Sequence, residues 1–244
     1  MYPVASTNER DYFNLMQVYL DAVFNPLIYD EPRIMEQEGW HYELMDKEDK
    51  LSYNGVVYNE MKGAFSNPRR ELWYQTYKHL YPGGVYGWES GGTPEGITSL
   101  TRENFLDFHR KYYHPANSYI FLYGDAPLEK ELRFIHEHCL SDYGQADPVS
   151  DPEEFPPFGG TRHVKEWYQY LGENHEDQIF LTYNFTAGRN TDHLLTFALD
   201  ILCEVLVNQE SAPLRLALAE AGIGKDVSAS SANFFQQTVQ IAAT

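Results

Sequence analysis

The chain has 244 residues, of which 43% are hydrophobic and 15% are aromatic. This content excludes a disordered chain and is enough for one large domain or for two lobes of ordinary size. The 36 acidic residues outnumber the 18 basic ones and give a net charge of −18, so the surface should repel nucleic acid and anionic membranes and attract basic peptides. No stretch approaches the ~20 apolar residues that cross a membrane, and no secretory signal pattern is visible.

The first 142 residues have the pattern of a lobe in which helices pack against short strands. Thr7 or Asn8 can cap one helix, and Thr101 can cap another. Apolar residues at helical spacing, and alternating runs bounded by turn residues, predict the other elements. In chain order we expect a strand in 2–7, a helix in 7–26, a hairpin in 39–55, helices in 56–65 and 69–82, a Gly-rich surface loop in 83–97, a helix in 100–115, a strand in 117–125 and a helix in 126–140.

Proline, glycine and acidic residues then gather without periodicity, which is typical of a linker. We predict a first lobe in residues 1–142, a linker in 143–161 and a second lobe in 162–244. The expected elements of the second lobe are strands in 162–171 and 177–186, helices in 190–208 and 212–222, and strands in 225–235 and 236–244. This order predicts an α+β fold, with two lobes of mostly antiparallel sheet packed with helices.

The sequence gives little support for a histidine metal site or for a cysteine or serine nucleophile. His136 and His138 lie about 200° apart around a helix, so they cannot share a face that binds a metal. His41 alternates with aromatic residues in a predicted strand, which favours a structural role. Cys139 and Cys203 lie far apart in helical patterns, which predicts two buried free thiols in a reducing compartment. No serine nucleophile motif is present.

One carboxylate, Glu60, stands in the largely apolar run "VVYNEMKGAF" at residues 56–65. If this run is a helix, Val56, Glu60 and Gly63 share one face. A carboxylate there is turned to water, paired, or bound to a cation, because burying it alone is very costly. Composition alone favours a polar stripe that Glu60 shares with Asn59 and Lys62.

Several longer blocks carry a resemblance that covers almost the whole chain in order. They are "YPVASTN", "NLMQVYLDAVFNP", "QEGWHYEL", "NGVVYNEMKGAFSNP", "FHRKYYHPANSYIFLYGD" and "PLRLALAEAGIGKDV". Together they resemble the presequence-protease branch of the M16 peptidases, the insulinase- and pitrilysin-like zinc metallopeptidases. In that family two histidines of an H-x-x-E-H helix and a glutamate on a later helix hold zinc. The glutamate lies in a block that matches Asn59–Gly63, so the resemblance implies that Glu60 is the third zinc ligand.

The chain departs from the family pattern because H-x-x-E-H occurs nowhere in it. We therefore expect an internal fragment of a longer enzyme, in which the first lobe lacks its N-terminal part and the second lobe is incomplete. No catalytic residue is expected within this chain, because the general-base glutamate would lie upstream. The fragment alone should be inactive and should hold zinc weakly or not at all, since one carboxylate cannot retain the ion.

The resemblance implies that the whole enzyme degrades unfolded peptides, and that its partners are peptide substrates and the remainder of its own polypeptide. The expected compartment is the cytoplasm, or the mitochondrial matrix in a eukaryote. An apolar surface left by the absent elements could drive self-association. The alternative is a non-catalytic M16-like module that binds peptides or serves as a scaffold.

Overall fold

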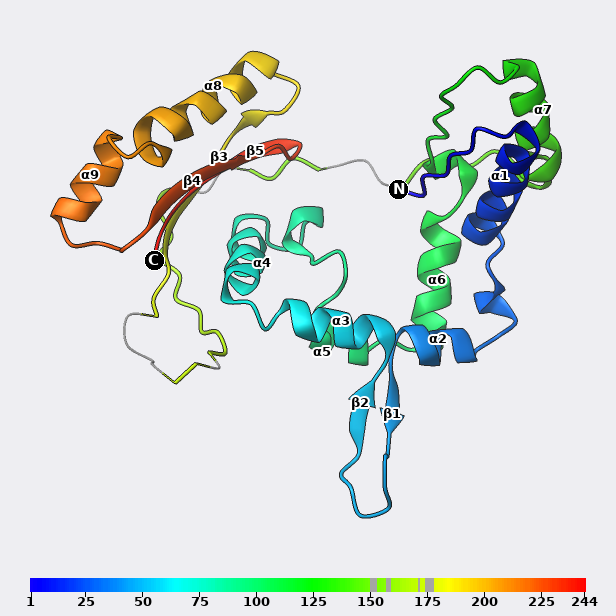
Figure 1. Ribbon diagram of the computed structural model, residues 1–244, viewed down its shortest axis with the longest axis horizontal. Coiled ribbons are helices and arrows are strands. Elements are labelled where there is room, and N and C mark those ends of the chain that lie inside the picture. Colours follow the sequence, from blue (N-terminus) through cyan, green and yellow to red (C-terminus); the bar gives the residue numbers. More distant parts are fainter. Residues whose placement is uncertain (150–152, 157–158, 171, 174–177) are drawn as a thin grey trace. The chain divides into compact units, whose positions relative to one another are not determined.

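The computed structural model describes residues 1–149, 153–156, 159–170, 172–173 and 178–244 (Figure 1). The chain divides into two compact units. The first unit comprises Met1–Glu60 and Pro94–Asp151, and the second comprises Met61–Thr93 and Pro152–Thr244. Residues 150–152 and 157–158 of the expected linker lie outside the described residues, and the lobe boundaries at 142 and 162 stay predictions.

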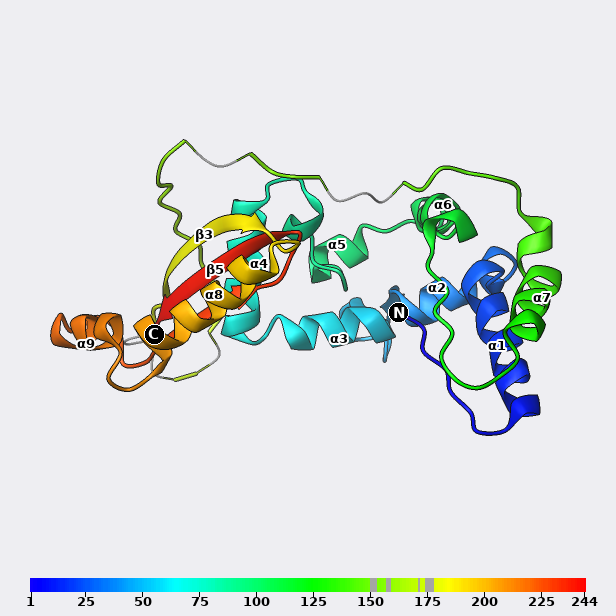
Figure 2. The ribbon, with the colours of Figure 1, turned by 90° about the horizontal axis from the view of Figure 1, so that it is seen from above.

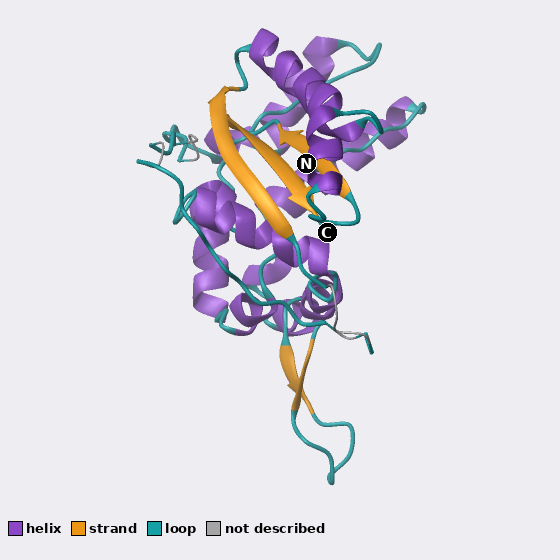
Figure 3. Cartoon of the chain, turned by 90° about the vertical axis from the view of Figure 1, so that its left-hand side faces the viewer, coloured by secondary structure: helices purple, strands orange, loops and turns teal. Residues whose placement is uncertain are grey.

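The first unit is mainly helical, with one small antiparallel hairpin that projects from the helices (Figure 3). Phe13 and Met16 of one helix pack on Ile135 of another to form its core, and Leu122 packs against them. Asn8 caps the first helix, and Thr101 forms a capping box with Asn104, as the sequence predicts. The elements are α1 (Glu9–Phe24), α2 (Arg33–Glu38), β1 (His41–Glu43), β2 (Ser52–Asn54), α3 (Val56–Ala64, which continues into the second unit), α5 (Pro94–Thr98), α6 (Arg102–Tyr112) and α7 (Leu128–His138), with 3₁₀ turns at Leu27–Tyr29, Pro115–Asn117 and Leu140–Asp142.

The second unit is built on a three-stranded antiparallel sheet in the order β3-β5-β4 (Figures 1 and 2). The central strand β5 pairs with β3 on one edge and with β4 on the other. Its elements are α4 (Pro68–Leu80), β3 (Leu181–Arg189), α8 (His193–Cys203), α9 (Pro213–Glu220), β4 (Val227–Ala232) and β5 (Gln236–Ala243), with a 3₁₀ turn at Val85–Gly87 and a π-helical turn at Glu204–Asn208.

Side chains of β5 alternate between two helical layers, because successive residues of a strand point to opposite faces. Val239 packs against Leu199 and Cys203 of α8. On the other face, the hydroxyl of Tyr81, which follows α4, lies 2.5 Å from Thr238 Oγ1, and Gln240 Nε2 donates to Thr76 Oγ1 of α4 at 3.3 Å. The sheet thus packs on α8 mainly through apolar side chains, with a hydrogen bond from Gln237 to Thr196 among them, and it meets α4 through polar groups.

Three expected strands do not form. Residues 2–6, 118–123 and 162–170 are neither helix nor strand, although their sequences alternate or are rich in β-forming residues. A strand requires a neighbouring backbone that accepts and donates its hydrogen bonds, and none pairs with these segments within the described part of the chain. The expected Gly-rich loop in 83–97 also differs, because it contains a 3₁₀ turn and the start of α5.

Candidate metal ligand on helix α3

Glu60 lies in the middle of α3, where the sequence predicts a helix. Tyr58 and Met61, three residues apart, form the buried side of this helix, with 9% and 7% of their surface exposed. Glu60 is exposed, because the helical turn places its side chain away from these two residues. The carboxylate is thus presented to the surroundings rather than to the core.

A network of side-chain amides fixes the start of α3 against the hairpin. Asn54 Nδ2 donates to Glu43 Oε2 of β1 at 2.7 Å. Asn54 Oδ1 accepts from the Gly55 amide at 2.8 Å and from Asn59 Nδ2 at 2.6 Å. Asn59 is the immediate neighbour of Glu60, so the same network holds the helical turn that carries the candidate ligand.

The backbone of Gly55 lies so close to the backbone of Gly39 and Trp40 that no residue with a side chain would fit. Its φ is +153°, and a Cβ at this position would overlap the backbone of Gly39 and Trp40. The amide of Tyr58 also donates to the Gly39 carbonyl at 3.3 Å. Sequence reasoning did not identify this junction, although the Asn-Gly dipeptide before an apolar helix is a signal for such a turn.

The face of α3 around Glu60 is open. Val56, one turn before Glu60, is 52% exposed. A Cβ added to Gly63, one turn after it, would meet no atom within 4 Å. Within the part of the chain that the structure describes, the Glu60 carboxylate has no hydrogen-bond or ion-pair partner. Of the three arrangements that the sequence allows, the described structure shows Glu60 exposed and not paired.

The described residues form no cluster of potential metal ligands around Glu60. No group of three or more His, Cys, Asp or Glu residues among them could hold an ion. His41 Nδ1 lies 2.7 Å from the Glu36 carbonyl, as expected of a structural histidine. His109 Nε2 lies 2.9 Å from the Val23 carbonyl and is likewise engaged. Glu60 therefore stays a single candidate ligand, and no described histidine or further carboxylate completes a metal site with it.

The two cysteines offer no nucleophile in this structure. Cys139 and Cys203 are buried and free, one in each unit. Burial raises the pKa of both thiols, and neighbouring carboxylates raise it further.

Among the described residues, no helix is both long enough and apolar enough to cross a bilayer.

Comparison with known proteins places the chain in a family. A sequence model described as "Peptidase M16 inactive domain" matches residues 99–243, which is more than half of the chain. The chain therefore belongs to the M16 peptidase family, in agreement with the resemblance of its sequence blocks. Glu60 precedes the matched residues.

The relatives that match are several times longer than this chain. Protein HypA of Clostridium perfringens is 46% identical over 239 residues, which are 98% of this chain and 25% of that protein. Presequence protease 1, chloroplastic/mitochondrial, of Arabidopsis thaliana is 39% identical over 227 residues, which are 92% of this chain and 21% of that protein. The chain thus spans about a quarter of the length of these curated relatives.

Solved structures show the same fold at low sequence identity. The structure of a protease from Helicobacter pylori has a TM-score of 0.60 and 16% identity, and the match covers 97% of this chain and 53% of that one. Pitrilysin has a TM-score of 0.51 and 15% identity, with 95% of this chain and 23% of that one covered. The mixture of helices and small antiparallel sheets is therefore the M16 fold.

Proposed function

We propose that this chain is part of a zinc-dependent metalloendopeptidase that degrades unfolded peptides, and that Glu60 is one of the zinc ligands. The observation that carries the proposal is the Glu60 carboxylate, exposed on the open face of α3 in the block Asn59–Gly63. The relatives that are named presequence proteases support the activity.

A catalytic zinc is usually held by three protein ligands of nitrogen and oxygen, with a fourth position left for water. Glu60 would supply one oxygen, and two histidines would come from an H-x-x-E-H helix outside these 244 residues. Zinc held there would supply the activation of a water molecule for hydrolysis of a peptide bond. The contribution of this chain is to hold Glu60 in place through Asn54, Gly55 and Asn59.

The surface charge is consistent with peptide substrates of opposite sign. A net charge of −18 attracts basic peptides over a range that depends on salt. The remainder of its own polypeptide is the second proposed partner, because the relatives extend well beyond the matched region. We propose the cytoplasm or the mitochondrial matrix as the compartment, since several relatives are named mitochondrial.

A non-catalytic module that binds peptides or serves as a scaffold is the second candidate. The observation in its favour is the description of the matching family model as an inactive domain, over residues 99–243. In this case the full-length protein would bind unfolded peptides without cleaving them.

A peptidase assay on the full-length protein separates the two candidates. We expect an unstructured peptide to be hydrolysed, a chelator to stop the reaction, and added zinc to restore it. The 244-residue chain assayed alone should show no hydrolysis. Peptide binding by a folded, zinc-supplemented full-length protein that does not hydrolyse the peptide would overturn the peptidase proposal and support the scaffold.

A further inference from the structure

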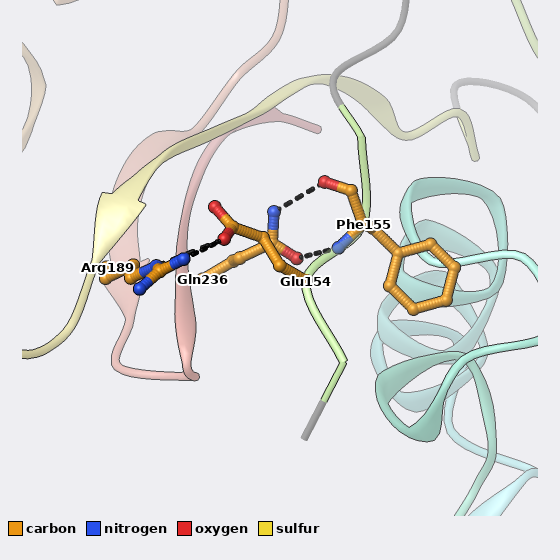
Figure 4. Close-up of polar contacts among 4 residues, drawn as sticks. All are labelled: Glu154, Phe155, Arg189 and Gln236. Carbon is orange, nitrogen blue, oxygen red and sulfur yellow. Dashed lines mark hydrogen bonds and ion pairs between the residues drawn. The ribbon is translucent and has the colours of Figure 1, made fainter. Parts of the chain in front are cut away.

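A short stretch of the second unit, Glu154–Phe155, is held against the sheet through its backbone (Figure 4). The amide of Phe155 donates to Gln236 Oε1 at 2.6 Å, and Gln236 Nε2 donates to the Phe155 carbonyl at 2.7 Å. The carboxamide of Gln236 therefore makes the pair of hydrogen bonds that a neighbouring strand would make. Gln236 lies on β5 and is only 7% exposed.

The side chains of Glu154 and Phe155 also contact residues of the second unit. The ring of Phe155 lies edge-on to Tyr81, with ring centroids 5.8 Å apart, and Tyr81 is completely buried. Gly84 leaves room for this ring, because a Cβ at position 84 would overlap it. Arg189 of β3 forms an ion pair with the Glu154 carboxylate (Figure 4).

These groups form a socket, defined here as Gln236, Tyr81, Gly84 and Arg189. It recognises a backbone amide and carbonyl, an aromatic ring, and a carboxylate one residue earlier. Any extended peptide with that pattern presents the same groups. An empty socket would leave the buried carboxamide of Gln236 without its partners, which favours refilling by a second peptide.

The acidic end of the stretch is accessible to solvent. Glu154–Phe155 belongs to no helix or strand, and the side chains of Glu154 and Arg189 are 47% and 56% exposed, so their ion pair is weak. Segments with few buried contacts open without unfolding of the unit that holds them. We propose that the socket is a peptide-binding site of the second unit, that its ligand is an extended peptide in which an acidic residue precedes an aromatic one, and that Glu154–Phe155 occupies it as a displaceable latch. This proposal involves neither Glu60 nor a metal.

The first test opens the latch with the double substitution Glu154→Ala and Phe155→Ala in the 244-residue chain. The probe is a fluorescent peptide with the sequence of residues 152–157, Pro-Glu-Glu-Phe-Pro-Pro, and binding is read by fluorescence anisotropy. We expect the opened variant to bind it at least about tenfold more tightly than the original chain, in which the tethered segment competes at high effective concentration.

Two controls make this binding specific. The same peptide with alanine for phenylalanine should not bind the opened variant. Adding Gln236→Glu, which keeps the size of the side chain and removes its donor, should weaken binding at least about tenfold. A folded opened variant that does not bind the probe, or that binds it equally well with Gln236→Glu, overturns the proposal.

A second measurement needs no substitution and serves even if the opened variant does not fold. Hydrogen exchange of the Phe155 amide in the original chain is compared with that of Val239, in the middle of β5. We expect the Phe155 amide to exchange at least about a hundredfold faster, because the latch opens by itself. Equal rates would mean that the segment is released only when the whole unit unfolds, and would contradict the latch.

Discussion

Residues 118–123 and the residues of strand β5 are both predicted as strands from the sequence, but only β5 forms one. In 118–123, Leu122 packs against the core of α1 and α7, whereas Tyr119, Phe121 and Tyr123 are 85% exposed or more. In β5, Val239 packs against α8, and Thr238 faces Tyr81 near α4. Residues 118–123 have a helical layer on one face only and are not paired as a strand. Strand β5 has a helical layer on each face and a neighbouring strand on each edge.

The difference teaches that side-chain alternation selects faces, and that backbone pairing decides whether a strand exists. An unpaired extended segment leaves its amides and carbonyls to water, so nothing fixes it as a strand. Tyr119, Phe121 and Tyr123 thereby leave an exposed aromatic surface on this segment. Self-association through this surface stays a prediction.

The largest expected effect is a difference in hydrogen exchange between these two regions. Amides of β5 should exchange at least ~10⁴-fold more slowly than those of residues 119–123, because the former open only with the sheet. Exchange followed by mass spectrometry of peptic fragments measures both in one sample. Comparable protection of residues 119–123 would show that this segment is paired in solution, with a second copy of the chain for example.

A matched pair of valine substitutions gives the next effect, within the second unit. Val239 is 3% exposed in β5, and Val164 is 52% exposed in the expected strand that does not form. Val239→Ala should lower the free energy of unfolding by about 2–3 kcal/mol, because two buried methyl groups are lost and a cavity remains. Val164→Ala should change it by less than ~0.5 kcal/mol. Urea unfolding of both variants checks this, and equal losses would mean that 162–170 is packed like a strand.

Alkaline pH should destabilise the second unit through Tyr77 of α4. Burial, with a smaller contribution from Tyr81, raises the pKa of Tyr77 from its ordinary value of 10.0 to about 12. The unfolded chain releases this proton near pH 10, while the folded chain keeps it until about pH 12, so the stabilisation present below pH 10 is lost as the pH rises through this window. A pKa shift of this size corresponds to a loss on the order of 2 kcal/mol in the free energy of unfolding. Water screens the effect little, because Tyr77 is only 8% exposed.

The substitution Tyr77→Phe tests the origin of this loss. It should make the free energy of unfolding fall less between pH 9 and pH 12 than in the original chain, by on the order of 2 kcal/mol. Tyr19→Phe, at a tyrosine that is 41% exposed, is the matched control and should leave the alkaline loss unchanged. An identical fall in all three chains would show that Tyr77 does not carry the pH dependence.

The helices could be predicted from the sequence because their signals are local. Asn8 and Thr101 cap helices at the expected places, and the apolar spacing in 56–65 and 126–140 predicts α3 and α7. Strands depend on partners distant in sequence. The sequences of 236–244 and 117–125 predict a strand in both, although among the described residues only the former has neighbouring strands.

The candidate site could be predicted only in part. The position of Glu60 on a helix follows from the spacing of apolar residues, but its role as a ligand rests on the resemblance of the block Asn59–Gly63. The socket could not be predicted, because Phe155 lies in a Pro- and acid-rich stretch whose composition predicts only a linker. Its recognition by Gln236 depends on residues 81 positions apart, which no local pattern brings together.

The most direct test of the central claim is a zinc titration of the full-length protein. The account predicts that Glu60→Gln weakens zinc affinity at least about tenfold, because an amide replaces a charged ligand. Glu103→Gln, at an exposed carboxylate of α6, should leave the affinity unchanged. Zinc bound by the Glu60→Gln variant as tightly as by the unsubstituted protein would contradict the assignment of Glu60 as a ligand.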